Sequence, residues 1–155
     1  MSMKLDGPLA DRDSWRATRC SVDLALTVVG TRSAMLLLRE AFYGTTRFHD
    51  FAGRVGITDA VASARLKELV EAGVFEKHPY QTPGSRTRFE YQLTEMGHAL
   101  LPVVLGLMQW GDRYLQEDDG PLHVVDDASG APVHVRVCLP DGSDVPETGL
   151  RVRPS

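Results

Sequence analysis

The order of patterns between Thr46 and Leu93 constrains the fold more than any other feature of the chain. Apolar residues at helical spacing cover 48–55, Gly56 begins a turn, and a second helical pattern covers 58–73. Two β-type runs joined by a loop with Pro and Gly fill 74–93. This order predicts a mainly α fold with a small β wing, the winged helix-turn-helix.

Three further helices are expected around this segment. The first covers 21–29, and the second is capped by Ser33, is apolar nearly all round and ends at Gly44. The third of these begins after Thr94 and is long, with Pro102 inside it, where a proline should kink a helix or cost a hydrogen bond. Thr46 is expected to open the helix before the turn.

Composition divides the chain into three expected parts. These are a flexible N-terminal arm at 1–19, the winged-helix domain with its dimerisation helices at 20–116, and an acidic tail with a β-hairpin at 117–155. The net charge is −4, yet residues 1–115 hold 14 basic and 13 acidic residues, while residues 116–155 hold 3 and 8. The acidity therefore belongs to the tail, and any affinity for DNA depends on where the cations lie.

The helix after the turn carries the side chains expected to enter a DNA major groove. Arg65 is the best candidate for a guanine contact, because its planar guanidinium matches O6 and N7 together. Thr58 and Ser63 suit phosphates or base edges, Lys67 suits phosphates, and Ala62 is expected on the same outer face. The alternative is an ordinary amphipathic helix with a solvated face.

The wing supplies a second set of cations. Arg86 and Arg88 are two residues apart, so on a strand they would share one face and could reach a DNA strand or its minor groove. Lys77 on the first strand could contact a phosphate, and Arg47 is a weaker candidate. The alternative is that these cations pair with carboxylates of the hairpin itself.

The two cysteines form no disulfide framework. Cys20 lies just before the first helix and beside Arg19, an arrangement that can lower a thiolate pKa, so it is a candidate redox sensor as well as a candidate packing residue. Cys138 is expected in an apolar strand. The spacing of His123, His134 and Cys138 predicts no metal site.

No catalytic motif is present, so we expect neither an enzyme nor a bound cofactor. No apolar run approaches the ~20 residues of a membrane span, and the N-terminus has no apolar signal region. These observations predict a cytoplasmic protein without a membrane partner.

The chain resembles the HxlR-type winged-helix regulators, relatives of the MarR-like repressors, from about Cys20 to Leu115. The resemblance is carried by ARLKELVEAGV at 64–74, by RFEYQLTEMG at 88–97 and by LLPVVLGLMQWGDRYL at 100–115. It implies a homodimer on a palindromic operator, and in some members the position of Cys20 senses oxidants. The first and last helices would form the dimer interface, through Leu24, Val104, Leu107, Met108, Gly111 and Tyr114.

One departure from the family pattern concerns ligands. The family usually has Gly-Gly-Lys-Trp where this chain has Gly30–Ser33, so a large aromatic is replaced by Ser33. A cavity there could hold a small-molecule effector. The sequence also leaves open a winged-helix ligand-sensing or protein-interaction module that does not bind DNA.

Overall fold

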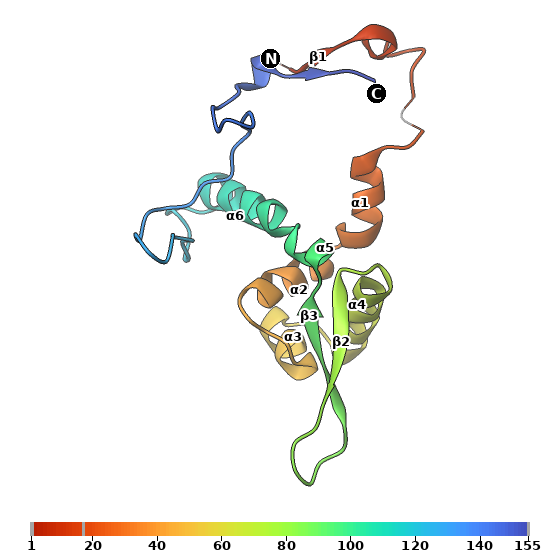
Figure 1. The fold of residues 1–155 in the computed structure, drawn as a ribbon, viewed down its shortest axis with the longest axis vertical. Helices are drawn as coiled ribbons and strands as arrows, with labels where there is room; N and C mark the ends of the chain where they lie inside the picture. The colour runs from red at the N-terminus through yellow and green to blue at the C-terminus, as the bar shows by residue number, and fades with distance from the viewer. Residues whose placement is uncertain (1, 17, 155) are drawn as a thin grey trace. The chain divides into compact units, whose positions relative to one another are not determined.

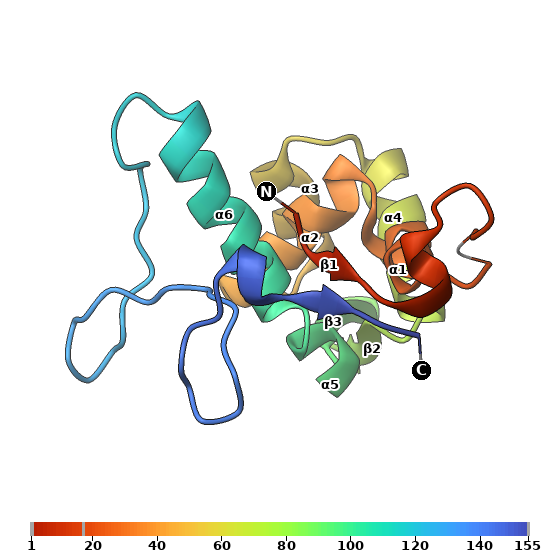
Figure 2. The same cartoon turned by 90° about the horizontal axis from the view of Figure 1, so that it is seen from above.

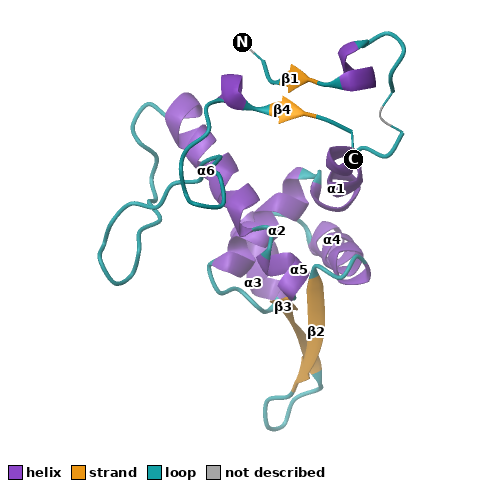
Figure 3. Ribbon diagram, turned by 45° about the horizontal axis from the view of Figure 1, so that its top comes forward, coloured by secondary structure: helices purple, strands orange, loops and turns teal. Residues whose placement is uncertain are grey.

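The computed structural model describes residues 2–16 and 18–154, and their contacts divide the chain into two compact units. The larger unit is Ser21–His123, and the smaller one combines residues 1–20 with residues 124–155. The larger unit is a mainly α fold with a two-stranded wing (Figures 1 and 3). Its elements are α1 (Ser21–Val29), α2 (Arg32–Phe42), α3 (Phe48–Val55), α4 (Asp59–Glu71), β2 (Phe75–Tyr80), β3 (Arg88–Leu93), α5 (Glu95–His98) and α6 (Leu101–Leu115).

Helix α2 lies at the centre of the core, as its apolar sequence predicts. Leu37 and Leu38 are fully buried, and α2 contacts α1, α3, α4 and α6. Phe51 of α3 and Phe75 of β2 meet edge to face at 5.9 Å between ring centroids. Burial of each such side chain stabilises the fold by about 1.5–3 kcal/mol, so α2 fixes where α3 and α4 lie.

The turn between α3 and α4 follows the sequence prediction. Gly56 adopts φ +71°, a left-handed conformation that costs glycine little, and ends α3. Thr58 caps α4, because its Oγ1 accepts a hydrogen bond from the backbone N–H of Val61 at 3.3 Å.

Two expected helix starts are wrong. Thr31, and not Ser33, caps α2, since Thr31 Oγ1 accepts from the N–H of Ala34 at 3.2 Å. Helix α3 begins at Phe48 instead of Thr46, because the carbonyl of Thr46 accepts a hydrogen bond from the N–H of Tyr91 at 2.8 Å. Because of this bond and the isolated bridge between Arg47 and Glu90, the segment before α3 is extended and pairs with β3.

The wing is an antiparallel pair whose register runs from Phe75 opposite Leu93 to Tyr80 opposite Arg88. Figure 1 shows the hairpin extending beyond α3 and α4 to a loop at its tip. The loop residue Arg86 lies outside both strands. The strand-alternation argument that put Arg86 and Arg88 on one face therefore does not apply.

The long last helix is divided into α5 and α6. Thr94 caps α5, with its Oγ1 accepting from Gly97 N–H at 3.1 Å, and α5 ends at His98. Pro102 falls within the first two residues of α6, where the N–H that proline lacks would have no helical partner. The proline thus begins a new helix and does not kink a continuous one.

The smaller unit joins the two ends of the chain (Figure 2). Strand β1 (Lys4–Leu5) pairs in parallel with β4 (Arg151–Val152), and Arg151 Nη1 lies 2.9 Å from Asp6 Oδ1. Short 3-10 turns cover Gly7–Ala10 (η1) and Glu147–Gly149 (η2). The expected loose arm at 1–19 therefore contains a paired strand.

The tail makes two chain reversals, and the first lies at the Ala-Ser-Gly turn where the sequence predicts a hairpin. Each is closed by one isolated antiparallel bridge, Val125 to Pro132 and Cys138 to Asp144, and each contains a glycine with positive φ. In the first reversal, hydrogen bonds from the hydroxyl and backbone N–H of Ser129 hold the pKa of Asp126 below its usual value. The pairing in both reversals is too short to form a regular strand.

Among the described residues, no single helix is long and apolar enough to cross a membrane. The pair α1 and α2 reaches that length and composition together, but it is bent by 77°.

Gly97→Ala should destabilise the larger unit. A Cβ at Gly97 would collide with the carbonyl oxygen of Val74 and with the side chain of Leu93, and overpacking of this kind costs about 1–3 kcal/mol. Gly53→Ala is the matched control, because its Cβ would meet no atom within 4 Å on α3 and should stabilise the helix by ~0.5–1 kcal/mol. Urea denaturation of both variants measures the difference, and equal free energies of unfolding would contradict the packing at Gly97.

Candidate nucleic-acid interface

Ser63 and Lys67 lie one turn apart on the outer face of α4, Thr58 is its N-cap, and half-buried Arg65 lies on the other side of the buried stripe. The two cations of the helix are already paired. Arg65 Nη1 forms an ion pair with Glu68 Oε2, and Lys67 Nζ lies 3.7 Å from Glu71 Oε1. Thr58 and Ser63 are exposed. Arg65 and Lys67 would have to exchange a carboxylate on their own helix for a DNA group.

The expectation that Ala62 lies on this outer face is wrong. Ala62 is fully buried, because it belongs to the stripe of α4 that also buries Leu66 and Leu69. The small residues that remain open at the start of α4 are Ala60, Ser63 and Ala64.

The wing cations have no such carboxylate partners. Among the described residues, no carboxylate lies within ion-pair distance of Lys77, Arg86 or Arg88. The hairpin carboxylates are engaged elsewhere: Glu76 Oε1 lies 3.1 Å from His78 Nε2, and Glu90 Oε1 accepts from Gln92 Nε2 at 3.0 Å. The alternative hypothesis, in which these cations pair with carboxylates of the hairpin itself, is therefore wrong for Lys77, Arg86 and Arg88.

A cleft of about 490 Å³ at the base of the wing brings Lys77 and Arg88 together with Arg47. The guanidinium carbon of Arg47 lies 5.0 Å from the centre of the Tyr80 ring, and Lys77 Nζ lies 4.5 Å from that of Phe89. Cation–π contacts hold these cations in place without neutralising them. Asp50 also lines the cleft, so three cations face one carboxylate and the cleft carries a net positive charge.

Arg47, a weaker phosphate candidate from the sequence, thus lies in the same cleft as Lys77 and Arg88. The sequence signal for this cleft is the alternation of basic and aromatic residues in the two strands, KHPY at 77–80 and RFEY at 88–91. Burial also raises the pKa of the Tyr91 hydroxyl, which lines this cleft.

The apolar surface of the larger unit is concentrated on α1 and on one side of α6. Positions i, i+4, i+7 and i+11 of α6 form an exposed stripe, which we name the outer stripe. It consists of Val103, Leu107, Trp110 and Tyr114, with exposed fractions of 47%, 54%, 54% and 60%. On α1, Val22, Leu24 and Leu26 are exposed as well.

Three residues expected in the dimer interface lie on a different side of α6. Val104 is 9% exposed and belongs to the core of its own chain. Met108 and Gly111 face α2 across a cavity of about 550 Å³. The reason is geometric: these positions lie roughly a quarter turn from the outer stripe on a helix of 3.6 residues per turn.

The same cavity corrects the expectation about Ser33. Ser33 is half-buried with its Oγ 3.4 Å from Thr31 Oγ1, and it does not line the cavity. The open space begins farther along α2, at Met35.

Both cysteines are free thiols. Cys20 is half-buried directly before α1, as expected. Cys138 is exposed and lies at an isolated bridge, so its expected place in an apolar strand is wrong. Among residues 2–16 and 18–154, no group of three His, Cys, Asp or Glu side chains is placed to hold a metal ion.

These features define a winged helix-turn-helix protein with a cationic wing. The helix-turn-helix family described as HxlR-like matches residues 28–119, which is more than half of the chain. The protein belongs to this family.

Relatives with the same architecture are named as regulators. A Mycobacterium tuberculosis protein called an uncharacterized HTH-type transcriptional regulator is 46% identical over 101 residues, 65% of this chain and 63% of the relative. The match thus covers less than two thirds of that relative. YdeP of Bacillus subtilis, also named an HTH-type transcriptional regulator, is 33% identical over 64% of this chain and 77% of its own.

Solved structures give the same fold. The crystal structure of PA1607, described as a transcription factor, superposes with a TM-score of 0.77 at 37% identity and covers 87% of this chain and 94% of its own. The redox regulator HypR in its reduced form superposes with a TM-score of 0.57 at 28% identity, over 63% and 95% of the two chains. These names agree with the expectation that the chain is a transcriptional regulator.

Proposed function

We propose that the protein is a transcriptional regulator that binds double-stranded DNA, with α4 in the major groove and the wing on the flanking phosphates. The observation that carries this proposal is a set of cations for which the described residues provide no carboxylate partner: Arg47, Lys77 and Arg88, which line one cleft together with Asp50, and Arg86 in the wing loop. Phosphates would supply the missing negative charge. Thr58, Ser63 and Lys67, which are exposed, and Arg65, which is half-buried, would then lie near the bases and the adjoining backbone.

The protein is proposed to act as a homodimer. The outer stripe of α6 and the exposed side chains of α1 form apolar surface that a lone chain leaves in water. Of the residues that the family resemblance implies in the interface, Leu24, Leu107 and Tyr114 fit this surface. Two-fold symmetry would place the two α4 helices on half-sites of a palindromic operator ~34–36 Å apart.

Regulation through Cys20 is the second part of the proposal. Cys20 directly precedes α1, one of the helices that carries the exposed apolar surface, so oxidation there would act on the dimer. Relatives of known structure include regulators described by their redox state, HypR in reduced and oxidized forms and YodB treated with diamide.

A winged-helix module that senses a ligand or binds a protein without binding DNA is the alternative, favoured by the near-neutral charge of residues 1–115. Salt dependence separates the two, because phosphate contacts release counterions and most protein contacts do not.

Arg86→Gln and Arg88→Gln should each weaken binding to operator and non-operator DNA alike. Each change should also lower the slope of log affinity against log salt by about one, as expected for the loss of one phosphate contact. Arg65→Ala should cost about 1–3 kcal/mol on the operator alone. Fluorescence anisotropy with DNA from the gene's own upstream region, at several salt concentrations, measures both effects.

Arg136→Gln is the matched control for that experiment, since Arg136 lies in the smaller unit and pairs with Asp144. Its affinity and salt slope should stay unchanged. If the double variant Arg65→Ala/Arg86→Ala binds the operator with unaltered affinity, the proposed DNA contacts of these two residues are wrong.

Leu107→Glu and Trp110→Glu should each convert the dimer to a monomer, because a charge would be buried in the outer-stripe contact. Light scattering after size exclusion gives the mass directly. Phe89→Glu, the same kind of change at an exposed apolar residue of the wing, should leave the dimer intact. A dimeric mass for all three variants would place the interface elsewhere.

Hydrogen peroxide should release the protein from DNA in the wild type and in Cys138→Ser, but not in Cys20→Ser. Peroxide converts a thiolate to a sulfenic acid and is itself reduced to water, which changes the polarity at the start of α1. A mobility-shift titration with and without peroxide tests this. Release of Cys20→Ser at the wild-type peroxide concentration would remove Cys20 as the sensor.

A further inference from the structure

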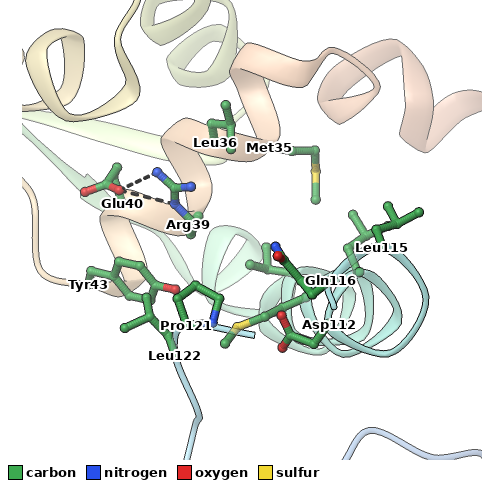
Figure 4. A pocket seen from close by; sticks show the side chains of 14 residues that line it. Met35, Leu36, Arg39, Glu40, Tyr43, Asp112, Leu115, Gln116, Pro121 and Leu122 are labelled. Carbon is green, nitrogen blue, oxygen red and sulfur yellow. Dashed lines mark hydrogen bonds and ion pairs between the residues drawn. The ribbon is translucent and has the colours of Figure 1, made fainter. Parts of the chain in front are cut away.

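The cavity between α2 and α6 has the size of a small-molecule site. Its volume of about 550 Å³ lies within the ~300–1,000 Å³ of typical ligand pockets. Figure 4 shows Met35 and Tyr43 reaching toward it from α2, while Leu122 lies on the segment after α6. All of its lining residues belong to the larger unit.

Gly111 widens this cavity. It lies in the middle of α6 and lines the space, and a Cβ built there would meet no atom within 4 Å. A helical glycine costs about 1 kcal/mol relative to alanine, and here no close packing requires it. The open volume over Gly111 is therefore available to a ligand.

The polar end of the cavity carries one uncompensated negative charge. Arg39 and Glu40 neutralise each other, with Arg39 Nη2 2.7 Å from Glu40 Oε1. Asp112 faces the same cavity, and none of the described cations forms an ion pair with it. Because α6 ends at Leu115, the negative end of its dipole lies nearby and adds to the same sign.

The turn after α6 passes close to Asp112. Gly120 has φ +84°, a conformation that favours glycine, and a Cβ there would collide with Oδ1 of Asp112 in its present position. The reversal at Gly120 leads directly to Pro121 and Leu122, which close one side of the cavity. The same turn therefore lies beside the Asp112 carboxylate and supplies the apolar residues Pro121 and Leu122 of the cavity lining.

We propose that this cavity binds an organic cation with a bulky apolar body, whose charged group pairs with Asp112 and whose body fills the space over Gly111. The site would serve as the effector site of the proposed regulator and, in that role, rests on the proposed function. Its lining joins α6, which carries the outer stripe, to α2, which packs against α4. A ligand there would change the distance between the dimer helix and the DNA-binding helix.

The test uses two probes of nearly equal shape and opposite charge, tetraphenylphosphonium and tetraphenylborate, titrated into the full-length protein by calorimetry without DNA. We expect the cation to bind about tenfold more tightly than the anion, the scale of one partly exposed ion pair. Asp112→Asn should lower the affinity for the cation about tenfold and leave the anion unchanged. Asp118→Asn removes the same charge outside the cavity lining and should change neither by more than about twofold.

Gly111→Leu fills the cavity without a backbone clash, so it should abolish binding of the cation while the melting temperature stays equal or rises. Absent binding to the wild type, or equal affinity in wild type, Asp112→Asn and Gly111→Leu, would overturn the proposal. Because no DNA is present, a protein that binds the cation but no DNA would refute the regulatory function and leave the binding site standing.

Discussion

The burial of α2 is the interaction on which the rest of the larger unit depends. Leu37 and Leu38 lie at the centre of a core to which α3, α4, the wing and α6 all contribute. The opposite side of α2 lines the cavity and carries the Arg39–Glu40 pair. One helix therefore supports the proposed DNA-binding elements on one side and the proposed ligand site on the other, and a disturbance on either side must pass through it.

The parts of the fold that were predictable from the sequence depend on local chemistry. Thr58 as a cap and Gly56 and Gly73 as helix ends place α4 correctly, because caps and left-handed glycines act within a few residues. The predicted start of α3 at Thr46 was wrong because it depends on a contact between residues far apart in the sequence. The hydrogen bond from Tyr91 N–H to the Thr46 carbonyl joins residues 45 positions apart, and no local pattern reveals it.

The break between α5 and α6 has a similar origin. Thr94 caps α5 and also donates to the Gly73 carbonyl at 2.6 Å, so α5 is fixed against the end of α4, and α6 leaves in a direction of its own from Pro102 onward. A helical wheel divides the apolar residues of α6 into separate faces. It does not say which face packs against α2 and which stays exposed, because that depends on where α2 lies. Val104 belongs to the core of its own chain, and Met108 and Gly111 line the cavity beside α2.

The carboxylates that pair with Arg65 and Lys67 have a consequence for discrimination between DNA sequences. The spacings Arg65–Glu68 and Lys67–Glu71 keep the proposed recognition face nearly neutral while the protein is free. On random DNA, a phosphate would merely replace a carboxylate for each cation, with little net gain, and Glu68 and Glu71 would be left near a negatively charged backbone. A correct base can offset the loss of the carboxylate through a bidentate hydrogen bond to Arg65. Glu68 and Glu71 would therefore disfavour binding to incorrect sequences. The unpaired wing cations would supply attraction that is the same for every sequence.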